Sequence, residues 1–100
     1  MATIGKKELV KLIAAKMNTT QIEADKFVNT FIDVIENQVA EGNRVRLIGF
    51  GSFDKRDRGA RRGLDIRSGK PITIPATTVP AFTSGAEFRK KVKKIAEESK

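Results

Sequence analysis

The side chains best suited to chemistry are cations, and they crowd into one stretch of the chain. Residues 54–70 hold seven cations against three acids, a net charge of +4. An arginine can place two N–H groups on one phosphate, so a row of arginines is typical of a surface that binds a polyanion. The candidate binding residues in this stretch are Lys55, Arg56, Arg58, Arg61, Arg62, Arg67 and Lys70.

Only Ala60, Leu64 and Ile66 are apolar in this stretch, and Ile66 is the most informative of them. Ile66 lies between Asp65 and Arg67 in a polar segment, where exposing a β-branched side chain is unfavourable. Apolar side chains that insert between base steps kink DNA, which makes Ile66 a candidate wedge. The alternative is a turn residue that packs against Leu64 or Ile72, and composition alone favours neither role.

A second basic run, Arg89-Lys90-Lys91-Val92-Lys93-Lys94, lies near the C-terminus. A helix this short, with few apolar residues and no tryptophan, is a poor membrane anchor. We therefore prefer a phosphate contact that flanks the first basic stretch. A solvated helix face is the alternative.

The absent residue types exclude most catalytic sites. The 100 residues contain no histidine, cysteine, tryptophan or tyrosine. This removes thiol nucleophiles, histidine bases, zinc sites of the usual kind and disulfides. No carboxylate pair stands out, and no base is available to activate Ser52 or Ser84. We expect no enzyme, no cofactor and no metal.

The overall charge points to the class of partner. The net charge is +8 and the isoelectric point is about 10.1, values that favour nucleic acid or an anionic membrane surface. No apolar run approaches the roughly 20 residues of a membrane span. We therefore expect a cytoplasmic protein with no membrane partner.

The elements that must position these residues begin with two helices. Apolar residues recur at helical spacing after Gly5 and predict a helix over about 6–17. The pattern Thr20-Gln21-Ile22-Glu23 is typical of a capping box and predicts a second helix over about 21–41. Gly42 is placed to end that helix in a left-handed conformation.

The second predicted helix is apolar over an unusually wide sector. Its apolar positions span about 160° of the helix surface, against the roughly 100° that one packing surface needs. A chain of this size offers few other partners, so we expect two copies to share one core as a homodimer. A monomer whose sheet covers the whole sector is the alternative. The sector contains Ala24, Phe27, Val28, Phe31, Ile32, Val34, Ile35 and Val39.

Strand signals follow Gly42. Residues 44–47 alternate in polarity, Gly49-Phe50-Gly51 predicts a tight turn, and residues 52–54 resume a strand. Ile72-Thr73-Ile74, between two prolines, predicts a returning strand. The basic stretch between them is then a ribbon with its tip near 63–69. On its strands Arg56, Arg58 and Arg62 share one parity, and Lys55 and Arg61 the other unless Gly59 introduces a bulge.

Two motifs and the basic stretch carry a family resemblance that covers essentially the whole chain. The motifs are Gly49-Phe50-Gly51-Ser52-Phe53 and Val79-Pro80-Ala81-Phe82. With the order of two helices, hairpin, basic arm and last helix, the sequence resembles the HU/IHF family of bacterial histone-like DNA-binding proteins. The family's fold is an intertwined dimer whose arms wrap and bend DNA through the minor groove.

The resemblance implies an α+β fold: an intertwined homodimer of a helical hairpin, an antiparallel sheet with a long basic β-ribbon arm, and a C-terminal helix. One domain would cover 1–100. Its parts would be a helical dimerisation part over 1–42, a sheet over 43–82 with the arm at about 54–75, and a helix over 83–100.

The resemblance also implies DNA-contacting residues. Arg56, Arg58, Arg61 and Lys70 match arm positions, and Gly69 matches the glycine of the arm-tip turn. Lys6 and Arg89 match basic positions of the body. The family usually has Gly-Arg-Asn-Pro at the tip, where this chain has Gly63-Leu64-Asp65-Ile66. Isoleucine thus replaces the intercalating proline, and the resemblance favours Ile66 as a wedge.

These observations predict a nucleoid-associated architectural protein that binds duplex DNA with little sequence preference, bends it and compacts it. Bent, nicked or gapped duplexes should be preferred. A sequence-preferring subunit of the integration-host-factor type, working as a heterodimer with a paralogue, is the alternative. A third hypothesis is a basic RNA-binding protein, although no aromatic residue of the arm could stack on bases.

Overall fold

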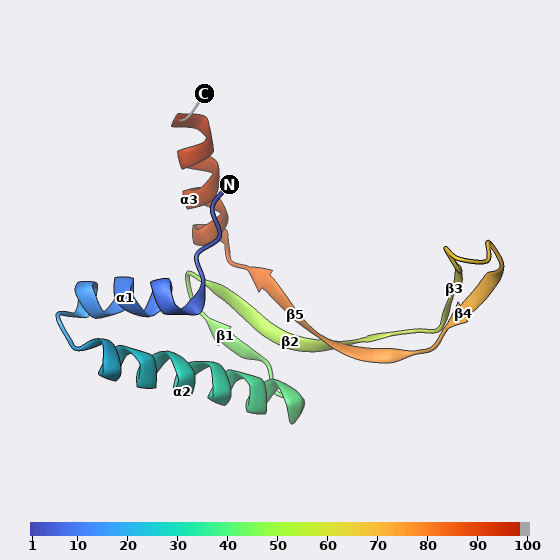
Figure 1. Ribbon diagram of the computed structural model, residues 1–100, viewed down its shortest axis with the longest axis horizontal. Coiled ribbons are helices and arrows are strands. Elements are labelled where there is room, and N and C mark those ends of the chain that lie inside the picture. The colour runs from blue at the N-terminus through green and yellow to red at the C-terminus, as the bar shows by residue number, and fades with distance from the viewer. Residues whose placement is uncertain (99–100) are drawn as a thin grey trace. The chain divides into compact units, whose positions relative to one another are not determined.

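The computed structural model describes residues 1–98 and has an α+β fold (Figure 1). In chain order the elements are α1 (Lys6–Met17), α2 (Gln21–Ala40), β1 (Val45–Leu47), β2 (Gly51–Arg58), β3 (Arg61–Leu64), β4 (Pro71–Ile74), β5 (Thr77–Ser84) and α3 (Ala86–Glu98). The contacts of the chain divide it into two compact units, residues 1–37 and the residues from 38 onward. No helix in the described range is long and apolar enough to span a membrane.

The first unit is a helical hairpin with a small core. Val10 and Ala14 of α1 are buried with Ala24 and Val28 of α2, and Ile13 packs against them half-buried. The larger apolar side chains of α2 stay outside this core: Phe27 is 51% exposed and stacks on Phe31, with 5.9 Å between ring centroids. The predicted bounds of the first helix are confirmed, and the second ends one residue earlier than predicted.

The helix ends follow from local hydrogen bonds. The backbone N–H of Glu23 donates to Thr20 Oγ1 at 3.1 Å, which confirms Thr20 as the cap of α2. The Glu23 carboxylate accepts a hydrogen bond from the hydroxyl of Thr19, whereas in a capping box it would accept one from the backbone N–H of Thr20. At the other end Gly42 has a φ of 100°, and Asn43 N–H donates to Gln38 O at 3.0 Å. This left-handed glycine stops α2 as predicted.

The second unit contains a three-stranded antiparallel sheet with the strand order β1-β2-β5. The long strand β5 pairs with β2 over all eight residues; the predicted sheet over 43–82 includes most of it, but no separate strand after residue 74 was predicted. Pro80 hides it in the sequence, but β5 lies at the edge of the sheet, where a missing N–H is tolerated. A side chain at Gly51 would lie 2.5 Å from the Thr83 carbonyl oxygen, so this close strand pair requires glycine.

One face of this sheet carries an aromatic cluster. Phe50 lies 5.3 Å from Phe82 and 5.5 Å from Phe88 of α3, measured between ring centroids, and Phe53 lies 4.8 Å from Phe82. The cluster anchors the start of α3 to the sheet. The helix begins later than the predicted residue 83, because Ser84 still pairs with Gly51 as the last residue of β5. Residues 99–100 of the predicted helix lie outside the described residues.

Candidate nucleic-acid interface

The basic stretch forms a two-part antiparallel ribbon, with β2 and β5 continued by β3 and β4 (Figure 1). Arg58 pairs with Thr77 at the end of the first ladder, and Arg61 pairs with Ile74 at the start of the second. Residues 59–60 therefore lie opposite 75–76, two against two. Gly59 introduces no register shift, so the predicted parity of the arm cations is kept across the break.

Most of the arm cations have no side-chain partner among the residues that the structure describes. Their side chains are exposed and form no ion pair or side-chain hydrogen bond with any of residues 1–98. Such guanidinium and ammonium groups keep all their donors available for a ligand. The residues are Arg58, Arg61, Arg62, Arg67 and Lys70.

The two cations at the base of the arm are engaged. Arg56 Nη2 donates to Thr83 Oγ1 at 2.8 Å, and Arg56 Nε lies 3.5 Å from Asp54 Oδ1. Lys55 lies on the opposite face of β2 and its ammonium donates to Ala40 O at 3.5 Å, at the C-terminal end of α2. The structure thus places Lys55 apart from Arg56, at a helix end that favours a cation.

The tip of the arm is a closed turn that presents Ile66. Asp65 N–H donates to Lys70 O at 2.9 Å, Gly69 N–H donates to Asp65 O at 2.7 Å, and Arg67 N–H donates to Asp65 Oδ1 at 3.0 Å. Gly69 adopts a φ of 69°, which a glycine tolerates best. Ile66 is 98% exposed, so it does not pack against Leu64 or Ile72. The alternative role as a packed turn residue is wrong.

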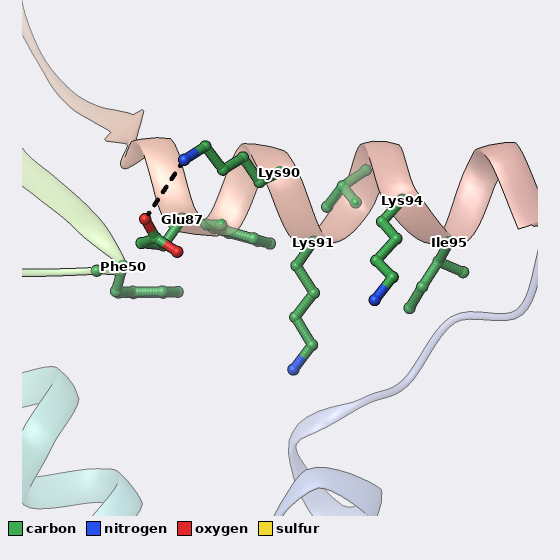
Figure 2. A pocket seen from close by; sticks show the side chains of 9 residues that line it. Phe50, Glu87, Lys90, Lys91, Lys94 and Ile95 are labelled. Atoms are coloured by element: carbon green, nitrogen blue, oxygen red, sulfur yellow. Dashed lines mark ion pairs between the residues drawn. The ribbon is translucent and has the colours of Figure 1, made fainter.

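The remaining predicted cations belong to helices and not to the arm. Lys6 is the first residue of α1 in the helical unit. Arg89 of α3 donates from Nη1 to Ser84 O at 2.6 Å. A hollow of about 800 Å³ is lined by apolar residues that include Phe50 and Ile95 and by Lys90, Lys91 and Lys94. Figure 2 shows these three lysines on α3, and Lys90 forms an ion pair with Glu87 at 3.8 Å.

The sheet contains two cations that the sequence analysis did not assign to a site. Arg44 and Arg46 flank Val45 on the first strand segment, and their alternation predicted a strand but no binding role. Arg46 pairs with Ser52, so both arginines lie on the face of the sheet that carries Arg56. Cross-strand register was the missing information, because it alone brings residues 44 and 56 together.

Fold and arm together define the class: a small basic α+β protein whose unpartnered arginines lie on a two-stranded arm. The family model described as "Bacterial DNA-binding protein" matches residues 4–93. DNA-binding protein HU of Clostridium pasteurianum is 41% identical over 91 residues, which cover 91% of this chain and 100% of that protein. HU of Nostoc sp. is 42% identical over 89 residues, covering 89% and 95%. The chain belongs to the HU-like family of bacterial histone-like DNA-binding proteins.

Solved structures agree with this assignment. Anabaena HU, in a cocrystal structure with DNA, matches with a TM-score of 0.84 and 42% identity, covering 88% of this chain and 96% of that one. A mutant of transcription factor 1 matches with a TM-score of 0.63 and 28% identity, covering 96% and 99%. The predicted family and the α+β fold class are therefore confirmed.

Proposed function

We propose that this chain is an architectural protein that binds duplex DNA through the minor groove with little sequence preference, bends it and stabilises the bent form. Family membership supports DNA as the partner, because the named relatives are DNA-binding proteins and one is seen with DNA. The proposed setting is the nucleoid of the cytoplasm, and no catalysis is involved. The proposed contacts are Lys6, Lys55, Arg56, Arg58, Arg61, Arg62, Ile66, Arg67, Lys70 and Arg89.

The observation that carries the proposal is the exposed Ile66 at the end of an arm of unpartnered arginines. An apolar side chain that is 98% exposed costs the free protein stability and finds no partner within residues 1–98. Insertion between two base pairs would bury it and unstack the step, which kinks DNA. The arginines beside it would bind the phosphates on either side, and arginine also suits a narrow minor groove.

We further propose a homodimer. In the helical unit the buried core consists of Val10, Ala14, Ala24 and Val28, while large side chains of α2 remain exposed. The exposed set is Ile22, Phe27, Phe31, Ile32 and Val34. A second copy that packs on this surface would bury it, because identical apolar surfaces form closed two-fold contacts. Sedimentation equilibrium should therefore show twice the chain mass, whereas a monomer at micromolar concentration would contradict the proposal.

The experiment that tests bending compares an intact duplex with the same duplex carrying a short gap, each labelled at both ends for fluorescence transfer. Bending an intact site costs roughly 1–6 kcal/mol, part of which the gap removes. We expect tighter binding to the gapped duplex and increased transfer on both. Equal affinity with unchanged transfer would refute bending by a wedge.

Selection from random duplexes tests the low sequence preference. We expect enrichment of flexible steps without a fixed sequence, since the proposed arm contacts are mainly to phosphates. A sharp consensus would replace the proposal with a sequence-preferring subunit of the integration-host-factor type. Preference for duplex RNA over duplex DNA in competition would contradict both.

A further inference from the structure

We propose that Asp54 is a positioning residue on one face of the three-stranded sheet, where it holds Arg44 and Arg56 in position for the DNA backbone. The inference rests on the proposed DNA binding and deepens it. We name this surface the arginine face and define it by Arg44, Arg46, Ser52, Asp54, Arg56 and Thr83.

Strand register places these residues on one face. Side chains alternate along a strand, so residues 52, 54 and 56 of β2 share a face. Arg46 pairs with Ser52 on β1, and Thr83 pairs with Ser52 on β5. Phe53 and its partner Phe82 lie on the opposite face, in the aromatic cluster. The arginine face thus carries polar residues on all three strands, together with the apolar Ala81 and Val79 opposite Asp54 and Arg56, while the other face carries the aromatic cluster.

Asp54 lies between two arginines. Its Oδ2 is 3.5 Å from Arg44 Nε, and its Oδ1 is 3.5 Å from Arg56 Nε. The Asp54 side chain is only 20% exposed, whereas the arginine side chains are 68% and 58% exposed. One acid therefore sits low in the face and two guanidinium groups stand above it. Both contacts use Nε, so the outer nitrogens remain directed away from the acid.

The outer nitrogens have donors to spare. Arg56 uses Nη2 on Thr83 Oγ1, and Arg44 forms no further hydrogen bond within residues 1–98. A hollow of about 360 Å³ is lined by Arg44, Arg46, Ser52 and Thr83 among other residues, which include Glu87 but not Arg56. Guanidinium and hydroxyl groups around an open hollow are the donors that phosphate and sugar oxygens accept.

The acid itself is the unusual feature. A carboxylate repels phosphate, so charge alone predicts that Asp54 weakens DNA binding. Its buried Oδ1 makes no hydrogen bond to any described residue, so the two arginine contacts at 3.5 Å are what offset the desolvation of the carboxylate. The arrangement is explained when Asp54 acts as a positioning residue: ordering two long arginine side chains beforehand removes an entropy cost from binding.

The test is a substitution for which charge and positioning predict opposite results. Asp54→Asn adds one positive charge and keeps the shape of the side chain. We expect affinity for an intact duplex to fall about 3- to 10-fold, the loss that corresponds to freeing one or two ordered side chains. Binding as tight as wild type or tighter would overturn the proposal.

Asp57→Asn is the matched control. Asp57 lies on the same strand on the opposite face, and its Oδ1 accepts a hydrogen bond from Thr78 Oγ1 at 2.7 Å. This variant adds the same charge without touching an arginine, so we expect unchanged or up to about 2-fold tighter binding. A loss equal to that of Asp54→Asn would show a general effect of the substitution on the sheet and overturn the positioning role.

A second variant keeps the proposal falsifiable even where Asp54→Asn unfolds. Arg44→Gln removes an exposed side chain and should lower the slope of log K against log salt by about one unit. In the double variant Arg44→Gln/Arg56→Gln, adding Asp54→Asn should cause no further loss of affinity. An unchanged salt slope for Arg44→Gln, or an undiminished Asp54 effect, would refute the inference. Bending is read separately by fluorescence transfer, so failure of the wedge leaves these affinity comparisons valid.

Discussion

The helical unit (residues 1–37) and the arm (residues 54–75) both expose side chains that folded proteins usually cover or pair. In the helical unit these side chains are apolar, and in the arm they are mainly cationic. α2 exposes large apolar side chains such as Phe27 and Val34. The arm exposes several arginines without an acidic partner among residues 1–98, and its most exposed apolar side chain is Ile66. Apolar area is best covered by apolar area and unpaired guanidinium groups by phosphate. The difference fits the two partners proposed above, a second copy for the helical unit and DNA for the arm.

Disrupting the helical surface should have the largest effect. Val34 is 52% exposed on α2, and Val34→Lys would bury an unpaired ammonium group between two copies. We expect a loss of more than about 3 kcal/mol of dimer free energy, over 100-fold in dissociation constant. Sedimentation equilibrium measures it. Thr30→Lys, on the polar side of the same helix, is the control, and equal weakening by both variants would remove α2 from the interface.

Neutralising the arm should be the next largest effect and should leave the fold intact. Arg61→Gln/Arg62→Gln removes two exposed cations that have no partner within residues 1–98. We expect the salt slope to fall by about two units, with affinity reduced about 10-fold per residue. Titrations at several salt concentrations measure both quantities. An unchanged slope would mean that these arginines do not contact phosphate.

Truncating the tip should change the DNA shape more than the affinity. Ile66→Ala removes apolar atoms that the proposed insertion buries, about 1–2 kcal/mol on gapped duplex. Fluorescence transfer should report a smaller bend. Ile48→Ala is the control because Ile48 is also highly exposed, at 94%, but lies between β1 and β2, outside the arm and outside the proposed dimer surface. An undiminished bend for Ile66→Ala would show that the isoleucine is not a wedge.

The smallest expected effect separates stability from binding. Thr20→Ala removes the hydroxyl that accepts the Glu23 N–H at the start of α2. Loss of such a cap costs about 1 kcal/mol and lowers the melting temperature by a few degrees. Thermal unfolding by circular dichroism measures this, while DNA affinity at 25 °C should not change. A loss of DNA affinity in Thr20→Ala would show that the stability of the helical unit affects DNA binding by the arm.

The sequence predicted most where structure is local. The caps at Thr20 and Gly42 use residues within five positions of each other, so short patterns identify them. The tip turn near Gly69 is local in the same sense. Strand β5 was missed because its pairing with β2 joins distant residues and Pro80 opposes a strand assignment.

The same limit applies to the candidate site. The arm cations are dense in sequence and could be recognised by charge alone. The arginine face could not, since Arg44 and Asp54 are ten positions apart and meet only through the register of β1 and β2. From the sequence, Lys55 is predicted to bind DNA like the other arm cations. Only the structure separates it from them, because its ammonium donates to Ala40 O.

The interruption at residues 59–60 and 75–76 has a mechanical consequence. An elastic ribbon bends where interstrand bonds are missing, so deformation of the arm concentrates at this joint. The joint is asymmetric: Gly59 rotates freely with open space around it, whereas Pro75 has a fixed φ. The strand register is the same on both sides of this joint, so we expect the paired strands β3 and β4 to move together as one unit. Ile66 can then follow the curvature of a duplex without loss of alignment with Arg62.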